Sequence, residues 1–329
     1  MLLLMVAAVF GVIRAHNLFV VVMMGGIYSF LMATVMVALD AVDVAMTEAA
    51  VGAGMSTVLM LAVLGLVKTR EAPLRHSPVI PLIVCLLTGG ALIYGTIDLP
   101  PFGRADNPQN QHVAPYYLEN AKKETGAPNV VTAVLASYRG YDTLGEVTVI
   151  FTGGIGVLVL LTAVRRRGEG DATMMRDTII LRVVVKLLLP VILLFALYVQ
   201  FHGDYGPGGG FQAGVAAAAA IILYGMIFGV MAARAVVPQR VVHTLIPLGV
   251  LIFAGTGVAG LLLDANYLDY SPLGSSQKAG QHLGILIVEA GVFVTVASTM
   301  LAIFYAFGGR AEDALADDET DKPDDWRRE

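Results

Sequence analysis

The chain has 329 residues, of which 57% are hydrophobic and only 14% are charged. This composition excludes an ordinary soluble protein and is typical of a membrane protein with several spans. The formal net charge is −5, and residues 308–329 alone carry nine acidic and four basic side chains, so the rest of the chain is neutral on balance. A chain with this charge distribution has no basic surface of the kind that binds nucleic acid.

The sequence lacks the residue patterns that redox or hydrolytic chemistry needs. Its single cysteine, Cys85, stands in an apolar run, which excludes a disulfide framework and a cysteine-ligated cluster. There is no CxxC, HExxH or GxSxG motif. We therefore expect no catalytic site, no bound metal and no cofactor. Because apolar residues follow Met1 directly, without a basic region, we expect a first membrane span there and not a cleaved signal peptide.

Nine apolar segments predict membrane-spanning helices, because a stretch of 18 or more residues with few charges suffices to cross a bilayer. They cover residues 1–14, 17–38, 41–67, 79–97, 143–164, 178–200, 210–233, 243–263 and 281–307. Lys and Arg gather after the third, fifth, seventh and ninth segments. The positive-inside rule then predicts an outside N-terminus and a cytoplasmic C-terminus. We expect an all-α polytopic protein of the plasma membrane with about nine transmembrane helices.

The stretch Val37–Leu66 carries a carboxylate, Glu48, inside its apolar run. An ionisable group at such depth costs roughly 2.5–3.5 kcal/mol and usually has a functional task. Glu48 lies eight residues beyond Asp40, or ~12 Å along a helix axis, so a capping role does not explain it. Asp40 is expected to cap the helix, with Asp43 as its capping-box partner, although both aspartates could also stand at the outer mouth of an ion path.

Two further charged groups are expected near the middle of the membrane. Glu289 lies ~12 Å from the outer end of its segment, and Lys186 lies ~13 Å from the inner end of its own. Together with Glu48 they predict a lateral row of charges at one level. Pro190 should kink the helix and free the carbonyl of Lys186. The alternative for Lys186 is a structural ion pair, for example with Glu289.

The loop between the sixth and seventh segments has an unusual sequence, FHGDYGPGGGF, from Phe201 to Phe211. It holds His202 and the run Pro207, Gly208, Gly209 and Gly210, which cannot continue a helix. A tight hairpin that lets the two helices approach closely is one interpretation. A broken-helix site that lines a cavity is the other.

The remaining segments divide the chain. Residues 98–128 contain several prolines and no helical period, and a short interfacial helix is predicted over 129–140. Residues 165–177 form a polar linker. We expect modules at 1–78, 79–170 and 171–307, followed by an acidic tail at 308–329 that is disordered or contacts a partner.

The sequence resembles Mrp-type multisubunit cation/proton antiporters. Residues 178–307 resemble the B subunit, most specifically through PGGGF, and residues 114–160 resemble the C-terminal part of the A subunit through RGYDTLGE, which contains Arg139, Asp142 and Glu146. Residues 2–67 resemble the three-helix module that precedes that part, through LDAVDVAMTEAAVGAGMST. The modules at residues 2–67 and 114–160 also resemble separate subunits of membrane-bound hydrogenases. The chain is therefore expected to be a fusion of an A-subunit tail with a B subunit.

The resemblance implies a heteromeric complex related to the membrane arm of respiratory complex I, with paths built from buried acidic and lysine side chains. It implies that Glu48 and Glu146, which match motif positions, belong to such a path. The prediction for Lys186 and Glu289 depends more on their depth in the membrane than on a motif. Many B subunits have an asparagine after the histidine of the hairpin, whereas this chain has Gly203 and Asp204. The role of Asp204 stays open.

The leading hypothesis is a subunit of a sodium/proton antiporter that contributes part of a proton or sodium path. The expected partners are a large A-type body, subunits of the C, D, E, F and G types, and the lipid bilayer. One alternative is the membrane arm of a redox-driven complex such as a membrane-bound hydrogenase. The other is a structural scaffold, in which the buried charges form ion pairs only.

Overall fold

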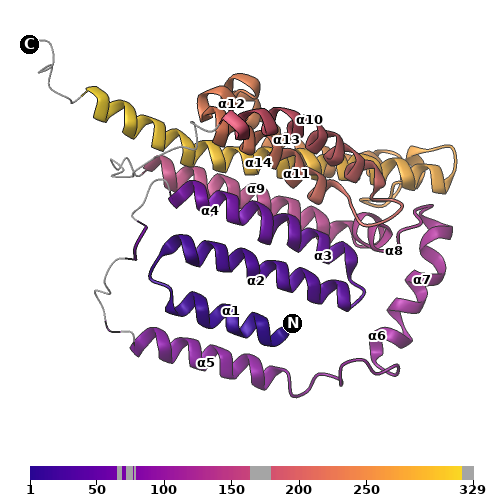
Figure 1. Ribbon diagram of the computed structural model, residues 1–329. Helices are drawn as coiled ribbons and strands as arrows, with labels where there is room; N and C mark the ends of the chain where they lie inside the picture. Colours follow the sequence, from indigo (N-terminus) through magenta and orange to yellow (C-terminus); the bar gives the residue numbers. More distant parts are fainter. Residues whose placement is uncertain (65–68, 72–76, 78, 164–178, 321–329) are drawn as a thin grey trace, which may run out of the picture.

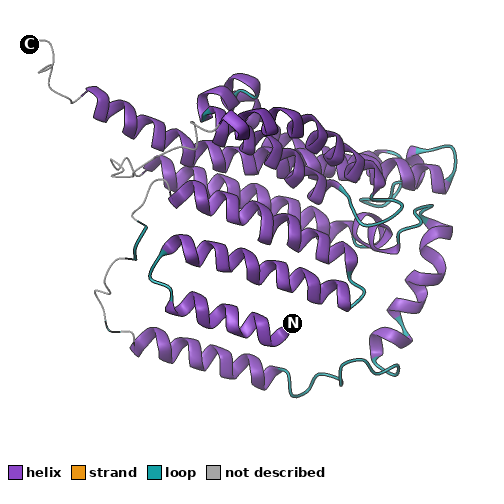
Figure 2. Ribbon diagram, in the orientation of Figure 1, coloured by secondary structure: helices purple, strands orange, loops and turns teal. Residues whose placement is uncertain are grey.

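The computed structural model describes residues 1–64, 69–71, 77, 79–163 and 179–320. These residues form helices joined by turns, with one isolated β-bridge between Asn17 and Arg70 (Figures 1 and 2). The expected all-α fold is confirmed for this part of the chain. The polar linker at 165–177 lies outside the described residues.

The first half of the chain is mostly a set of long antiparallel helices with short helices between them (Figure 1). Its elements are α1 (Leu2–Arg14), α2 (Leu18–Ala38), α3 (Val42–Glu48), η1 (Ala49–Ser56), α4 (Thr57–Leu64), α5 (Val79–Gly95), α6 (Pro108–Gln111), α7 (Val113–Glu124), α8 (Val130–Ala133), η2 (Val134–Tyr138) and α9 (Gly140–Ala163). The second half has α10 (Ile179–His202), α11 (Gly210–Phe228), α12 (Val230–Val236), α13 (Gln239–Leu262), η3 (Ser271–Leu273) and α14 (Gln277–Thr320).

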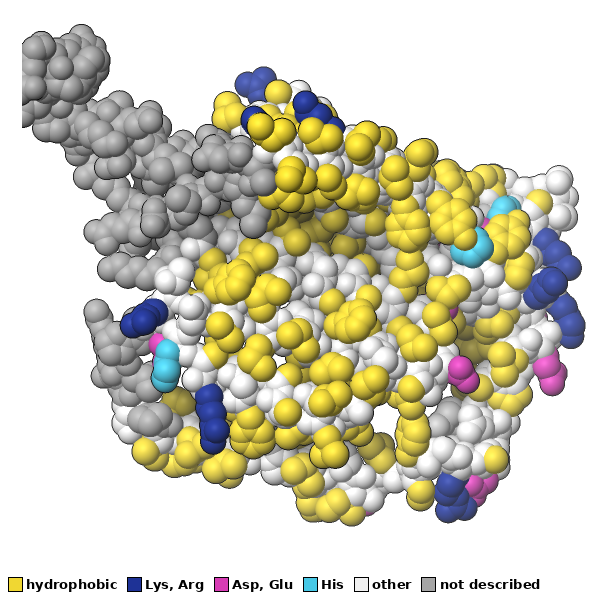
Figure 3. Space-filling view, viewed as in Figure 1, with side chains coloured by type: hydrophobic (Ala, Val, Ile, Leu, Met, Phe, Trp, Pro, Cys, Tyr) yellow, Lys and Arg dark blue, Asp and Glu magenta, His cyan; other side chains and the backbone are white. Residues whose placement is uncertain are grey.

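Seven helices of the described residues are long and apolar enough to cross a membrane. They span Leu18–Ala38, Val42–Leu64, Gly140–Leu161, Ile179–His202, Gly210–Phe228, Gln239–Leu262 and Gln277–Gly308. Helices α1 and α5, with 13 and 17 residues, are apolar but shorter. Figure 3 shows hydrophobic side chains over most of the visible face, with Lys and Arg at its edges. This distribution is that of a protein surrounded by an apolar environment.

Helix α14 organises the core, because α9, α11 and α13 all pack against it. Close packing depends on glycine: a Cβ at Gly249 of α13 would stand 2.7 Å from the backbone nitrogen of Thr295 on α14. A Cβ at Gly214 of α11 would stand 2.8 Å from the carbonyl of Phe293. Small residues at membrane-helix interfaces let backbones approach and pack by dispersion. The glycines therefore hold α11 and α13 against α14.

The chain turns sharply between α2 and α3, and this turn corrects the expected role of Asp40. Asp40 adopts a positive φ of 58° and is exposed, whereas the residue at the N-cap position of α3 is Ala41, without a side-chain cap. Aspartate tolerates the left-handed region better than most residues. Asp43 lies in the first turn of α3, where an acidic side chain complements the helix dipole. The predicted capping box is wrong.

The segment before α9 contains more helix than its prolines suggested. Helices α6 and α7 lie within residues 98–128, where no helix was expected. Proline is tolerated in the first turn of a helix, and Pro108 and Pro115 stand there in α6 and α7. The short helix predicted over 129–140 is confirmed by α8 and η2, and the Asn129 side chain caps it by accepting from the Val131 N–H at 2.9 Å.

Two predictions about the second half of the chain concern the acidic tail and Pro190. Helix α14 runs to Thr320, so residues 308–320 are helical and not disordered, in keeping with the alanine, leucine and glutamate content of this segment. Residues 321–329 lie outside the described part. Helix α10 passes through Pro190 as one helix.

The packing of α13 on α14 gives a test with a matched control. Gly249→Ala should destabilise the protein by roughly 1–3 kcal/mol, because its methyl group overlaps the α14 backbone. Gly255→Ala, on the same helix, meets nothing within 4 Å and should be neutral or slightly stabilising. Thermal unfolding of the purified protein in detergent measures both. Equal melting temperatures for the two variants would contradict the packing described.

Candidate functional site

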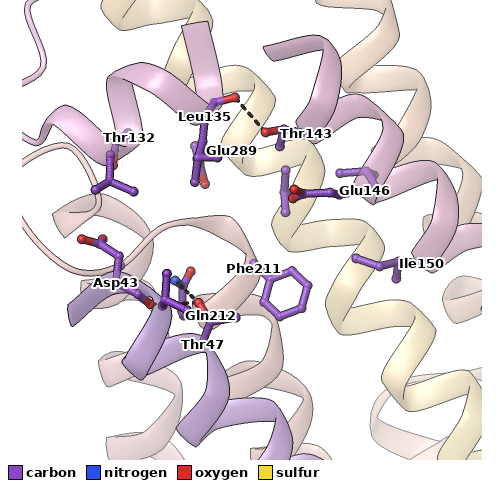
Figure 4. A pocket seen from close by; sticks show the side chains of 15 residues that line it. Asp43, Thr47, Thr132, Leu135, Thr143, Glu146, Ile150, Phe211, Gln212 and Glu289 are labelled. Carbon is purple, nitrogen blue, oxygen red and sulfur yellow. Dashed lines mark hydrogen bonds between the residues drawn. The ribbon is translucent and has the colours of Figure 1, made fainter. Parts of the chain in front are cut away.

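Three carboxylates from distant parts of the sequence line one cavity. The cavity has a volume of about 230 Å³ and lies between α3, the α8–η2 segment, α9, the start of α11 and α14 (Figure 4). Asp43, Glu146 and Glu289 contribute its acidic groups. The other lining residues are mainly apolar or hydroxyl-bearing: Val44, Thr47, Val131, Thr132, Leu135, Thr143, Val147, Ile150, Gly208, Phe211, Gln212 and Val292.

Glu289 is held by the N-terminus of α11. Its carboxylate accepts a hydrogen bond from the backbone N–H of Gly210, the first residue of that helix. Gly209 before it has a φ of 117°, and a Cβ there would stand 2.9 Å from Glu289 Oε2. The unpaired N–H groups and the dipole of a helix N-terminus favour a negative charge. The glycine run thus serves both the backbone conformation and the approach of this carboxylate.

The α10–α11 loop, residues 203–209, therefore lines a cavity, as one of the two interpretations of PGGGF predicted. Hydrogen bonds from α8 and its N-cap residue hold the loop in place. Thr132 Oγ1 donates to the Gly203 carbonyl at 2.6 Å, and Asn129 Nδ2 lies 3.0 Å from the Gly206 carbonyl. Pro207 is exposed, and the His202 ring stacks on Tyr198 with 4.9 Å between the ring centres. This loop is both a tight connection and a wall of the site.

Asp43 and Gln212 link α3 to the same region. Asn129 Nδ2 is 3.3 Å from Asp43 Oδ1, so one amide contacts both the loop carbonyls and this carboxylate. Gln212 is buried, and its Nε2 donates to Thr47 Oγ1 at 2.8 Å. These contacts place the polar face of α3 against the first turn of α11. Thr47 and Gln212 lie beside each other in Figure 4.

Glu146 enters the cavity from α9. It is exposed, and among the described residues its carboxylate has no hydrogen bond or ion pair. Thr143, one turn earlier, donates to the Leu135 carbonyl at 2.7 Å and joins α9 to the neighbouring η2 segment. Arg139 and Asp142 of the same motif pair with each other at 2.6 Å at the exposed start of α9. The motif thus contributes one carboxylate to the site and one ion pair beside it.

Glu48 lies one residue beyond Thr47 but is not among the lining residues. A Cβ at Gly52 would stand 2.5 Å from Glu48 Oε1 and 2.6 Å from Ser29 Oγ, so the missing side chain of Gly52 makes room for both. The π-helix η1 begins directly after Glu48. Such π-helical turns are frequent at functional sites.

The structure separates Lys186 from Glu289, so the expected level row of charges is wrong for the lysine. Lys186 Nζ lies 5.5 Å from the ring centre of Phe228, at the end of α11. Glu289 binds the start of the same helix, and the 19 residues of α11 put its ends roughly 27 Å apart. Counting residues from the helix ends gave the wrong level because the α10–α11 loop folds back into the protein, so that α11 begins beside Glu289. Lys186 is exposed on α10.

Asp204 and His282 form an ion pair that sequence reasoning missed. His282 Nδ1 is 3.0 Å from Asp204 Oδ2, and the side chains are 51% and 11% exposed, respectively. Burial raises the pKa of the Asp204 carboxyl above its ordinary value, and the charge of His282 partly opposes this shift. One signal was available: His282 stands seven residues before Glu289, which is two helical turns and the same face.

The raised pKa of Asp204 predicts a pH dependence of stability. Between the ordinary pKa and the folded-state pKa of Asp204, the folded protein keeps a proton that the unfolded chain has lost. The resulting stabilisation of the folded state is full below the ordinary pKa and is lost as pH rises through the folded-state pKa. The melting temperature of the wild type relative to Asp204→Asn should therefore fall from about pH 4 upward.

Asp264→Asn is the matched control for this measurement, because Asp264 is exposed and its positive φ of 60° suits asparagine. That variant should follow the wild type at every pH. A wild-type advantage over Asp204→Asn that grows with pH would contradict the assigned shift.

Family models match three consecutive regions of the chain. Residues 3–69 match the family of the MBH D subunit, residues 94–176 match that of the MBH E subunit, and residues 180–302 match the "Domain related to MnhB subunit of Na+/H+ antiporter". Asp43, Glu146 and Glu289 fall one into each region. The cavity therefore lies where all three regions meet.

Named relatives agree with these matches. A probable K(+)/H(+) antiporter A/B subunit of Rhizobium meliloti (strain 1021) is 26% identical over 89% of this chain and 32% of its own length. The Na(+)/H(+) antiporter B subunit of Bacillus subtilis (strain 168) is 27% identical over 38% of this chain and 93% of its own length. The chain thus spans about a third of the length of the Rhizobium protein.

Two solved structures contain similar chains. A chain in the Mrp complex from Dietzia sp. DQ12-45-1b has a TM-score of 0.75 and 30% identity, over 98% of this chain and 35% of that one. A chain of an archaeal membrane-bound sulfane sulfur reductase has a TM-score of 0.53 and 30% identity, over 70% of this chain and 97% of that one.

Proposed function

We propose that this chain, which belongs to the family of Mrp-type antiporter subunits, supplies part of the proton path of a multisubunit monovalent cation/proton antiporter. It joins the C-terminal part of an A-type subunit to a B-type subunit. The observation that carries this proposal is the cavity at which Asp43, Glu146 and Glu289 meet. The exchanged cation is sodium or potassium, as the names of the relatives indicate for those proteins.

The charge of the cavity supports a role in proton transfer. Among the described residues, neither Lys nor Arg pairs with any of its three carboxylates. Like charges around one small space favour protonation of at least one group, because the ionised forms repel each other. A carboxyl group that gains and loses a proton without a fixed counter-charge is a suitable carrier. Buried acidic groups in membrane proteins commonly form proton relays.

The arrangement of the carboxylates favours protons over a chelated metal cation at this place. The described residues contain no group of three or more His, Cys, Asp or Glu side chains that could hold a metal ion. The three carboxylates stand on different walls of the cavity, where each can exchange a proton with water. We propose that Glu48, next to Thr47, continues the route beyond the cavity.

The membrane arrangement is part of the proposal. We propose that α1 and α5 cross the membrane with the seven longer helices, which gives nine spans, an outside N-terminus and a cytoplasmic C-terminus. The plasma membrane is the proposed location. The proposed partners are the large A-type body and subunits of the C, D, E, F and G types.

Helix α10 is the proposed contact with a partner subunit. Arg182 and Lys186 stand one turn apart and lie 5.6 and 5.5 Å from the Phe228 ring centre. Both are accessible inside an apolar span, and among the described residues no carboxylate pairs with them. A charge at this depth is costly when it faces lipid, so a partner helix with an acidic side chain is the favoured neighbour.

A second candidate function is favoured by one comparison. The chain covers 97% of a subunit of the membrane-bound sulfane sulfur reductase, a respiratory membrane complex. The membrane arm of a redox-driven complex would use the same carboxylates while other subunits hold the redox groups. Iron–sulfur proteins that co-purify with this chain would favour this candidate over the antiporter.

The proton path is tested by Glu289→Gln in the assembled complex. A positioned proton-transferring group contributes on the order of 10²–10⁴-fold to a rate, so cation-dependent proton release from inverted membrane vesicles should fall on the order of 10²-fold. Glu119→Gln, an exposed acid on α7, should keep full activity. Co-purification of the other subunits shows whether the complex assembles. Full activity of Glu289→Gln in an assembled complex would refute the path, and loss of assembly would support the scaffold alternative.

The partner contact is tested by photo-crosslinking from α10. A benzoylphenylalanine placed at Leu187 or Val183, both exposed, should crosslink to a membrane segment of another subunit that contains Asp or Glu. The same group at Val185, which is 4% exposed and faces inward, should crosslink within the chain or not at all. Mass spectrometry of the crosslinked peptides identifies the neighbour. Crosslinks to phospholipid alone would overturn the assignment.

A further inference from the structure

The Asp204–His282 pair is a titratable group that the proposed cavity does not yet use. Asp204 lies in the α10–α11 loop and His282 lies near the start of α14. The imidazole is half exposed, whereas the carboxylate it contacts is almost fully buried. The pair therefore has one end that water can reach and one end that faces the protein interior. A pair with this polarity can collect a proton at one side and release it at the other.

The backbone of Asp204 is joined to the cavity through Asn129. The Asn129 N–H donates to the Asp204 carbonyl at 3.0 Å, and the Asn129 side chain reaches Asp43 at 3.3 Å. Gly208 of the same loop lines the cavity, and Gly210 at its end binds Glu289. The carboxylates of Asp204 and Glu289 are close enough to interact electrostatically. Asp204 thus lies in the same loop whose later residues form a wall of the cavity.

The chemistry of the two groups suits proton exchange. Imidazole gains and loses protons in the physiological range and has two nitrogens, so it can accept on one while it donates from the other. His282 Nδ1 faces Asp204, which leaves Nε2 for water. Two other charged groups belong to the same region: Lys278, one turn earlier on α14, and Asp269, which contacts Gln281 beside His282. Neither forms an ion pair with Asp204 or His282.

We propose that His282 and Asp204 form the proton entrance of the cavity at the end of the membrane where the α10–α11 loop lies. A proton binds His282 Nε2, the Nδ1 proton passes to the Asp204 carboxylate, and the resulting carboxylic acid delivers it to Glu289. Each step moves one proton and breaks no other bond. This inference rests on the proposed function, since it requires that Glu289 carries protons.

The experiment uses the reconstituted complex and measures cation-dependent proton flux. His282→Asn keeps a hydrogen-bonding group near Asp204 but cannot exchange protons, so flux should fall about tenfold or more. Imidazole added to the buffer should restore flux in a saturable manner, because a diffusible base can replace a half-exposed one. Asp204→Asn should also lose flux, and Asp204→Glu should regain much of it. The apparent affinity for the cation should not change.

The controls separate this inference from the proposed function. His112→Asn, an exposed histidine after α6, should behave as wild type. Glu289→Gln should be inactive and should not respond to imidazole. If Glu289→Gln is inactive while His282→Asn and Asp204→Asn are fully active, the entrance is refuted and the proposed function stands. If the two variants are inactive but neither imidazole nor Asp204→Glu restores flux, the pair is structural and the entrance is refuted as well.

Discussion

The hydrogen bond between Glu289 and the first N–H of α11 is the interaction on which the site depends. It requires that α11 begin below the ends of its neighbours, and only the run Gly208–Gly210 allows the backbone to do so. Glycine accepts the φ of 117° at position 209 and leaves space for the carboxylate. The recessed start of α11 opens the cavity, and the N-terminal dipole stabilises a negative charge inside it.

A second constraint comes from electrostatics. Asp43, Glu146 and Glu289 share one cavity, and Arg182 and Lys186 are accessible on α10. Within the part of the chain that the structure describes, neither group has a partner of opposite charge. Separated charges of this kind are costly in a membrane unless protons, water or other subunits compensate them. Both features fit the proposed role in a larger assembly, in which the acidic site would exchange protons and the face with Arg182 and Lys186 would contact a partner subunit.

The helical fold, most spans and the position of Glu289 inside an apolar helix followed from sequence, because hydropathy and a charge within an apolar run are local signals. Glu146 gained weight only through the family resemblance. The level of Lys186 was misjudged because a dipping loop shifts helix ends in a way that residue counting misses. Asn129, Gln212 and Asp204 act through contacts between distant segments, and no spacing in the sequence announces such contacts. Asp40 was misassigned because an aspartate before a helix is usually a cap, whereas here it forms the turn itself.

The cavity depends on the joining of three family regions in one chain. Each of the three family regions supplies one carboxylate, and no region alone encloses the cavity. The Bacillus subtilis protein aligns over 134 residues, 38% of this chain and 93% of its own length, which is too short to include the positions of Asp43, Glu146 and Glu289 together. A corresponding cavity there would have to form across a boundary between two chains. Covalent joining removes the entropy cost of bringing the regions together, and the hydrogen bonds of Asn129 to both Asp43 and the α10–α11 loop then fix their relative positions.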